Sequence, residues 1–487
     1  MASVTFSGPG ALGLVSPNYT KNVTTGSYLD LASTAGQGWA QQYLPDLYEA
    51  EVERYGDRSI SGFLSMIGAE EAMTSDQVVW SEQGRLHLAY KASIHTTTGV
   101  ITADSIRDID NEGGSDPVAH AVRKGQTVVC QIATGSDIAV VKAQCTAGIE
   151  AATNTLTLKP YGAATFKDLA NIAAENTATI RFFVYGSDFG KGSGAMEESV
   201  EAEFKSFSNK PIIIKDKYVV SGSDASQIGW IEVSGESGQG GYLWYLKSAG
   251  DTRKRFEDYL EMSVVEGVTK AGTSAATGTG TEGLFEAIED RGIVTSNAGM
   301  FDGATDDLAD FDVLIAELDK QGGIEENMLF LDRSANLAFD DMLAGANNYH
   351  SAGTNYGVFN NSEDMALNLG FNGFRRGGYD FYKSDWKYLN NKSTRGLVNN
   401  NATAGKVEGV LIPAGTTNVY DQGMGKNINR PFLHVRYRAS EADDRKMKSW
   451  ITGSVGAATS ALDAMEVHYL SERCLVVQAA NNFVLFR

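Results

Sequence analysis

The longest helical pattern in the chain covers residues 240–267. Its apolar side chains recur at helical spacings, at Tyr242, Tyr245, Leu246, Ala249, Phe256, Tyr259, Leu260 and Val264. This spacing places them on one face of a helix, and Gly267 is a residue type that commonly ends one. At 1.5 Å per residue the predicted helix is about 40 Å long. Such a length suggests a strut across a flat subunit.

Short segments that are typical of β-strands occupy the chain from residue 77 to residue 220. They are rich in β-branched and aromatic residues and are separated by Gly, Ser and Asn. Residues 101–195 hold most of them, which predicts a small β-barrel or sandwich inserted into a longer loop. The segments are 77–80, 84–90, 127–133, 138–143, 155–158, 179–185 and 210–220.

The rest of the chain alternates between helical and strand-like patterns. Residues 1–35 are rich in Gly, Ser and Thr, and predict an extended arm that becomes ordered on a neighbouring molecule. Helices are predicted at 38–55, 63–67, 306–321 and 334–343, and strands at 327–331, 377–382 and 407–412. The tail from 465 to 487 predicts two strands around residues 478–482.

Composition narrows the class of protein. A chain of 487 residues is expected to form two to four lobes. Its net charge of −20 disfavours condensation on nucleic acid, because phosphates would repel it. We find neither a signal peptide nor an apolar stretch long enough for a membrane helix, and expect synthesis and use in the cytosol.

No motif for catalysis, metal binding or cofactor binding stands out. Residues 278–283 match GxGxxG but follow a Gly/Thr/Ser linker instead of a strand. Residues 186–193 lack the spacing of a phosphate-binding loop, and no HExxH or GxSxG is present. We therefore predict no catalytic, cofactor or metal site, although a triad built from distant segments stays open. The three cysteines form no CxxC pair and are predicted to be buried free thiols, namely Cys130, Cys145 and Cys474.

Three consecutive basic residues interrupt the apolar stripe of the long helix. Arg253, Lys254 and Arg255 either form a solvated face or provide a surface for an acidic segment of an adjacent subunit. The acidity of the remaining chain makes the second reading as reasonable as the first, and both stay open.

The order of elements resembles the major capsid proteins of tailed bacteriophages, which share the HK97-like fold. The elements follow one another as in that family: first the extended arm, then the long loop with an inserted β-domain, then the strut helix and the C-terminal strand pair. Residues 80–87 and 210–233 resemble the rising and returning strands of its extended loop, and 241–267 resembles its spine helix. Further similar stretches are 283–292, 327–334 and 469–486, and the general sequence character is similar to the crAss-like phages.

The resemblance implies an α+β fold of the HK97-like type with five parts. These are an N-terminal arm with short helices (1–75), extended-loop strands (76–100 and 196–235), an inserted β-barrel-like domain (101–195), a peripheral domain (236–300 and 431–470, with the spine helix at 240–267) and an axial domain (301–430 and 471–487). Trp80 and Lys210, at the two ends of the extended loop, join the basic triplet as expected inter-subunit contacts.

The implied function is structural and not enzymatic. Copies of the chain would assemble as hexamers and pentamers into an icosahedral shell around viral double-stranded DNA, which they would contact without sequence specificity. Scaffold, portal and auxiliary capsid proteins are the other expected partners, with no membrane and no cofactor. The expected location is the virion capsid, assembled in the host cytoplasm. The alternatives are an encapsulin-like nanocompartment shell and, with less support, a β-rich adhesin or tail structural protein.

Overall fold

The computed structural model describes two compact units of the chain. It covers residues 69–109, 117–134, 137–149, 155–169, 176–194, 196, 201, 204–225, 233–234, 240–241, 244–270, 280–295, 307–348, 373–399, 405–421, 426–455 and 458–487. Unit 1 comprises Met1–Val79 with Ser208–Arg487, and unit 2 comprises Trp80–Phe207. The predicted arm at 1–35 and the helices at 38–55 and 63–67 lie outside the described residues.

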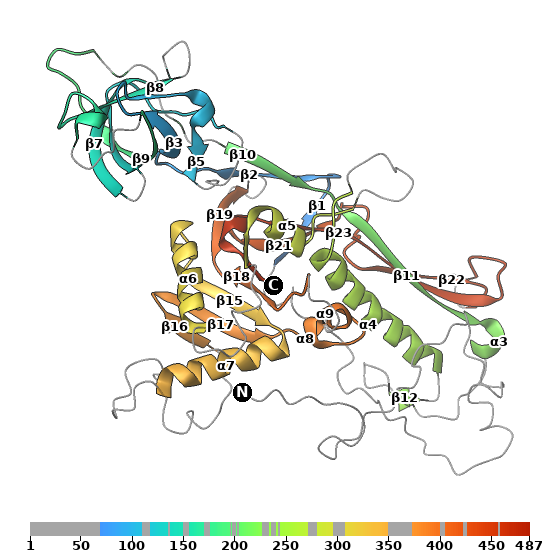
Figure 1. Ribbon diagram of the computed structural model, residues 1–487. Helices are drawn as coiled ribbons and strands as arrows, with labels where there is room; N and C mark the ends of the chain where they lie inside the picture. The colour runs from blue at the N-terminus through green and yellow to red at the C-terminus, as the bar shows by residue number, and fades with distance from the viewer. Residues whose placement is uncertain are drawn as a thin grey trace. The chain divides into compact units, whose positions relative to one another are not determined.

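Unit 2 is a closed β-barrel (Figure 1). Its ring runs β4-β8-β7-β6-β9-β3 and closes where Ile94 of β3 pairs with Ile101 of β4, while β5 adds to the outer edge of β3. Inward-facing side chains fill the barrel, and Phe166 is fully buried in it. The strands are β3 (Ala89–His95), β4 (Val100–Ile101), β5 (Arg107–Asp108), β6 (Gln126–Thr134), β7 (Asp137–Ala147), β8 (Leu156–Pro160) and β9 (Thr177–Ser187).

A two-stranded ribbon carries the chain into and out of the barrel. It pairs β2 (Val78–Gln83) with β10 (Phe204–Asn209). The single strand expected at 84–90 is wrong, because β2 ends at Gln83 and β3 begins only at Ala89. The expected boundary of the inserted domain at 101 is also wrong, since Tyr90, Ala92 and Ile94 point into the barrel core. Their alternation predicted a strand, but its partner, β9, lies far along the chain.

The first sheet of unit 1 has a long central strand, β23 (Ala464–Val477). One edge of β23 pairs along its length with β11 (Ile212–Ser221). The other edge pairs with β22 (Lys448–Gly453) and then with β21 (Leu433–Arg438), which carries the parallel strand β1 (Ala69–Met73). Helix α4 (Trp244–Val265) packs along β11 and β23 (Figure 1), where the rings of Phe256 and Tyr469 stack at 5.8 Å.

Helix α4 is shorter than the helix expected at 240–267. It begins at Trp244, because Gly240–Gly241 forms β13 and pairs with β12 (Val233–Ser234). Its 22 residues correspond to about 33 Å. Gly267 is not a left-handed cap; it is small because a Cβ there would lie 2.7 Å from the carbonyl oxygen of Thr281.

The second sheet of unit 1 is covered on both faces. Its strand order is β14-β24-β18-β15-β17-β16. Phe311 of α6 packs on one face among Phe339, Phe374 and Phe381, and α5 and α8 cover the other. The strands are β14 (Ile293–Thr295), β15 (Glu326–Leu331), β16 (Gly373–Arg376), β17 (Tyr379–Asp385), β18 (Gly409–Pro413) and β24 (Val484–Phe486), and the helices are α5 (Leu284–Arg291), α6 (Asp307–Lys320), α7 (Arg333–Asn348) and α8 (Lys387–Asn390).

The fold is therefore mixed, with helices and many strands, as the sequence predicted. The smaller elements are β19 (Thr416–Asp421), which pairs with β20 (Lys426–Pro431), and the helical turns α3 (Gly222–Ala225), α9 (Arg395–Asn399), η2 (Ala103–Ser105), η4 (Phe166–Asp168) and η6 (Ala480–Asn482). Within the described part of the chain, no helix combines the length and apolarity needed to cross a bilayer.

Candidate functional site

The basic triplet of α4 divides between contacts inside the chain and an exposed side. Arg255 donates from Nη2 to Oδ2 of Asp216 at 2.9 Å, which ties α4 to its own strand β11. Arg253 forms an ion pair with Glu257 at 3.2 Å, one helical turn further on, and stays largely exposed. Arg255 therefore contributes to the fold of its own subunit, and an inter-subunit role for all three basic residues remains a prediction.

Trp80 and Lys210 differ in what they offer to a neighbour. The Trp80 side chain is buried: its ring centroid lies 6.2 Å from that of Phe207, and its Nε1 donates to Glu82 at 3.0 Å. Packing across the β2–β10 ribbon thus uses the indole inside its own chain, and its contact with a neighbouring subunit stays a prediction. The side chain of Lys210 is exposed, and its proposed contact stays a prediction.

Asn209 is a buried residue that the sequence reasoning missed. Its Nδ2 donates to the carbonyl oxygens of Leu475 at 2.7 Å and Glu282 at 2.9 Å. Its Oδ1 accepts from the hydroxyl of Thr281 at 3.0 Å and from the backbone N–H of Lys210 at 2.8 Å. The side chain thus joins the end of the ribbon to β23 and to the loop before α5. A single Asn between two strands carries no sequence pattern that would predict these hydrogen bonds.

Two adjacent glutamates fix β1 to the sheet. Glu71 forms ion pairs with Arg430 at 2.7 Å and Arg436 at 2.8 Å, and Glu70 pairs with Arg473 at 3.3 Å and with Lys446. The network is partly exposed, and removing one partner should still weaken the attachment of β1, because the remaining charges lose their compensation. The network therefore holds the strand that leads into the β2–β10 ribbon.

His434 lies buried beside this network on β21. Burial, together with the nearby charge of Arg436, lowers its pKa to about 4, so that the imidazole is neutral at physiological pH. Its Nδ1 lies 3.1 Å from the carbonyl oxygen of Pro431. This residue makes the stability of unit 1 sensitive to acid.

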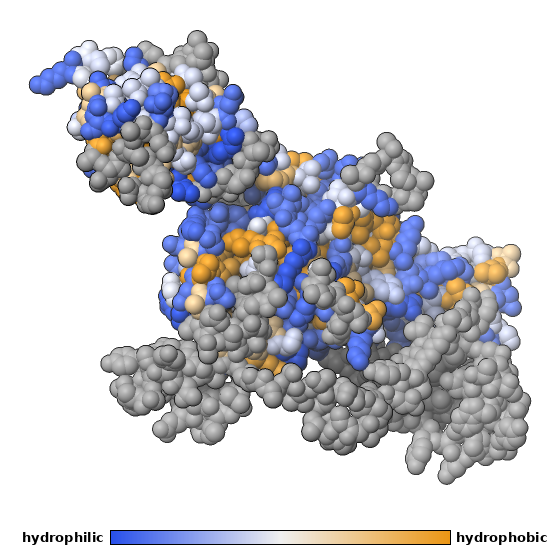
Figure 2. Space-filling view, viewed as in Figure 1, coloured by the Kyte–Doolittle hydropathy of each residue, from blue (hydrophilic) through white to orange (hydrophobic). Residues whose placement is uncertain are grey.

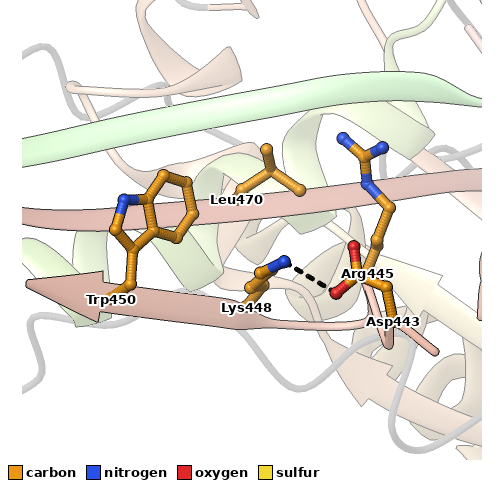
Figure 3. A pocket seen from close by; sticks show the side chains of 5 residues that line it. All are labelled: Asp443, Arg445, Lys448, Trp450 and Leu470. Atoms are coloured by element: carbon orange, nitrogen blue, oxygen red, sulfur yellow. Dashed lines mark hydrogen bonds and ion pairs between the residues drawn. The ribbon is translucent and has the colours of Figure 1, made fainter.

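An open hollow of about 420 Å³ lies on the face of the β22–β23 sheet (Figure 3). It is lined by Asp443, Arg445, Lys448, Trp450 and Leu470. Lys448 and Asp443 form an ion pair at 2.7 Å across it, and Trp450 stacks on His468 with centroids 5.1 Å apart. An indole, an aliphatic side chain and paired charges suit the packing of another protein's side chain.

The titratable groups in the described ranges include three cysteines. No group of three or more His, Cys, Asp and Glu side chains there could hold a metal ion. The three cysteines are free and buried, as predicted. Burial raises the pKa of both Cys130 and Cys474 to about 12, which keeps these thiols protonated and unreactive at neutral pH.

No family model and no curated protein matches the chain. Solved structures do match. The capsid structure of the cyanophage P-SCSP1u has a TM-score of 0.41 and 8% identity, covering 96% of this chain and 98% of that one. The capsid of a native GTA particle has a TM-score of 0.39 and 9% identity, covering 94% of this chain and 98% of that one. A chain from Microbacterium phage Oxtober96 has a TM-score of 0.39 and 8% identity, covering 93% of this chain and 98% of that one. The cyanophage and GTA structures are capsids, the class that the resemblance names; the crAss-like affinity stays a prediction.

Proposed function

We propose that the chain is the structural major capsid protein of a tailed bacteriophage. Copies of it assemble as hexamers and pentamers, and these form an icosahedral shell that encloses double-stranded DNA. In this function the chain needs extended contacts between subunits and no reaction centre. Large, repeated interfaces stabilise such closed assemblies.

The proposal rests on the path of the chain between β1 and β11. The chain leaves one sheet at its edge strand β1, runs through the β2–β10 ribbon and the barrel, and returns to the opposite edge of the same sheet as β11. Helix α4 then lies along that sheet. An excursion of this kind followed by a long helix is what the resemblance to the HK97-like capsid fold implies.

Each part of that fold has a counterpart in this assignment. The β2–β10 ribbon is the extended loop, and α4 is the spine helix. The five-stranded sheet with α4 is the peripheral domain, and the six-stranded sheet with α6 and α7 is the axial domain. The barrel is the inserted domain. Asn209 and the pairs of Glu70 and Glu71 would then anchor the two ends of the extended loop to the peripheral domain.

The charge of the chain fits a container for DNA. A net charge of −20 on 487 residues repels phosphate, so the packaged DNA would be confined without adhering to the wall. Scaffold, portal and auxiliary proteins would complete the particle, whose location is the virion after assembly in the host cytoplasm.

The test is to express the full chain, purify it and measure its assembly state. Sedimentation velocity should show five or six copies of the 52.2 kDa chain, about 260 or 310 kDa, and closed shells that electron microscopy resolves as icosahedral. Particles from infected cells should protect double-stranded DNA from nuclease until they are disrupted. A chain that stays monomeric at all concentrations and salts would refute the proposal, and shells that hold a cargo enzyme instead of DNA would favour a nanocompartment.

A further inference from the structure

A second open hollow lies on the barrel of unit 2, where the chain that follows β9 folds back onto the strands. Its volume is about 370 Å³, within the range of small-molecule sites, about 300–1,000 Å³. We call it the barrel hollow. Its lining combines an ammonium group, an amide, two hydroxyls, a carboxylate and an aromatic ring, which belong to Lys124, Gln144, Thr146, Ser193, Asp188 and Phe189.

Hydrogen bonds fix the chain segment that forms one wall of the barrel hollow. The backbone N–H of Asp188 donates to the carbonyl oxygen of Gly125 at 2.9 Å, and its carbonyl oxygen accepts from Nε2 of Gln144 at 2.6 Å. Oδ2 of Asp188 accepts from the hydroxyl of Tyr161 at 3.0 Å. The ring of Phe189 lies directly against Gly125, where a Cβ would be only 2.4 Å from it. The wall is therefore formed before any ligand arrives, which lowers the entropic cost of binding.

Three aromatic rings at and beside the barrel hollow are only partly covered. Phe189 is 43% exposed, and Tyr161 and Tyr185 are each 50% exposed. Both tyrosines lie beside Lys142: the N–H of Tyr161 donates to its carbonyl oxygen at 3.1 Å, and its ammonium group is 6.0 Å from the ring centroid of Tyr185. Figure 2 shows a mainly hydrophilic surface on the face of this unit in view, with hydrophobic side chains scattered in it. The exposed rings are thus set among polar groups.

The lining of the barrel hollow disfavours several classes of ligand. A phosphate group would face the carboxylate of Asp188, with the ammonium group of Lys124 as the one cation in the described lining. A lipid chain would leave the amide, the hydroxyls and the carboxylate without hydrogen bonds. A peptide that adds to a sheet needs a free strand edge, whereas β7 and β8 beside the hollow are paired on both edges.

A sugar ring has the chemistry that this lining can recognise. Its hydroxyl groups donate and accept hydrogen bonds, and within the described part of the chain Oδ1 of Asp188 and Oε1 of Gln144 have no hydrogen-bond donor. One face of a pyranose carries C–H groups, which pack on the face of an aromatic ring. A few polar groups that fix orientation, next to an aromatic surface, are typical of small-molecule sites.

We propose that the barrel hollow binds a carbohydrate. Phe189 packs against the sugar ring, and Asp188 and Gln144 accept hydrogen bonds from its hydroxyl groups. This activity goes beyond the proposed function, because the assembly of a shell does not require it. The barrel would give each copy of the chain one sugar-binding site, and many copies in one particle would bind a glycan-covered surface with high avidity.

The first experiment asks whether the full chain binds carbohydrate. The epitope-tagged chain is applied to a microarray of oligosaccharides built from neutral hexoses, deoxyhexoses, N-acetylhexosamines and uronic acids. Isothermal titration calorimetry with the free oligosaccharide then measures the affinity of each positive. We expect saturable binding of at least one oligosaccharide with one site per chain. A chain that binds none of these sugars would overturn the inference and leave the proposed function intact.

The second experiment locates the site with matched variants of the full chain. Phe189→Ala is compared with Phe204→Ala, which removes an equally exposed type of ring from the same unit outside the lining of the hollow. We expect at least about tenfold weaker binding for Phe189→Ala and wild-type affinity for Phe204→Ala. Asp188→Asn preserves the size of the side chain and should also weaken binding, because a carboxylate is the stronger acceptor.

Folding and assembly are read separately from sugar binding. Thermal unfolding of Asp188→Asn and Phe204→Ala should match that of the wild type, and electron microscopy should show normal shells for all three variants. Unchanged affinity in both Phe189→Ala and Asp188→Asn would place the sugar elsewhere and overturn the inference. A wild-type chain that binds sugar but forms no shells would support the inference and refute the proposed function.

Discussion

Protonation of His434 should destabilise unit 1 as the pH falls below neutral. In the folded chain the imidazole has a pKa of about 4, because it is buried and lies near Arg436. In the unfolded chain the value is about 6.5. Between these two values the unfolded state binds the additional proton, so that stability rises with pH. The contribution is complete above pH 6.5 and is lost as the pH falls toward 4.

The size of the effect follows from the two pKa values. Between pH 7.5 and pH 5.0, linkage predicts a loss of about 2 kcal/mol from His434 alone, out of about 3.4 kcal/mol for the full shift. The loss is a large share of the stability of an ordinary domain. Neither His434→Gln nor His434→Leu can take up the proton, so both variants should lack this part of the pH dependence even if their absolute stabilities differ.

The assay must report on β21 and not on the barrel. Hydrogen exchange at increasing urea, read by mass spectrometry on peptides that cover Leu433–Arg438, gives the opening free energy of this strand. Measurements at pH 7.5 and 5.0 on the unassembled wild type and both variants cancel the other titrating groups, Glu71 among them. Equal losses in all three proteins would refute the assignment of the acid sensitivity to His434.

Three further perturbations test other parts of the fold. Phe166→Ala should lower the stability of the barrel by about 3–5 kcal/mol in thermal unfolding, and Phe311→Ala should lower that of unit 1 by a similar amount, because each ring is fully buried in its own unit. Each variant should shift the transition of its own unit only. A single transition shared by both units would contradict this expectation. Gly453→Ala should cost at least about 2 kcal/mol, since φ is +127° and a Cβ would lie 1.8 Å from the carbonyl oxygen of Ala464. Gly190→Ala, where a Cβ would meet open space, should change the free energy of unfolding by no more than about 0.5 kcal/mol. Urea titration measures both glycine variants. A thiol reagent such as DTNB at pH 8 should label the cysteines of the native chain slowly, because they are buried, and should label all three after denaturation. Rapid labelling of the native chain would show that these thiols are accessible. The three are Cys130, Cys145 and Cys474.

The sequence by itself determined most of the local structure. The period-2 pattern at 179–185 predicted strand β9, and the helical spacing at 306–321 predicted α6 to within a residue at each end. These patterns depend on backbone geometry within a few residues, where a strand repeats every two residues and a helix every 3.6. The buried state of the free thiols followed from composition in the same way.

Only the tertiary structure decided which of these elements meet. The pattern of Ala89–His95 predicted a strand but not its place in the barrel, which depends on pairing with Thr177–Ser187. The basic residues of α4 looked equivalent in sequence, yet Arg255 pairs with Asp216 of β11, whereas Arg253 pairs with Glu257 within α4 itself. The hydrogen bonds of Asn209 have no local sequence signature at all. Each results from contacts between segments far apart in the chain, and side-chain periodicity carries no information about such pairings.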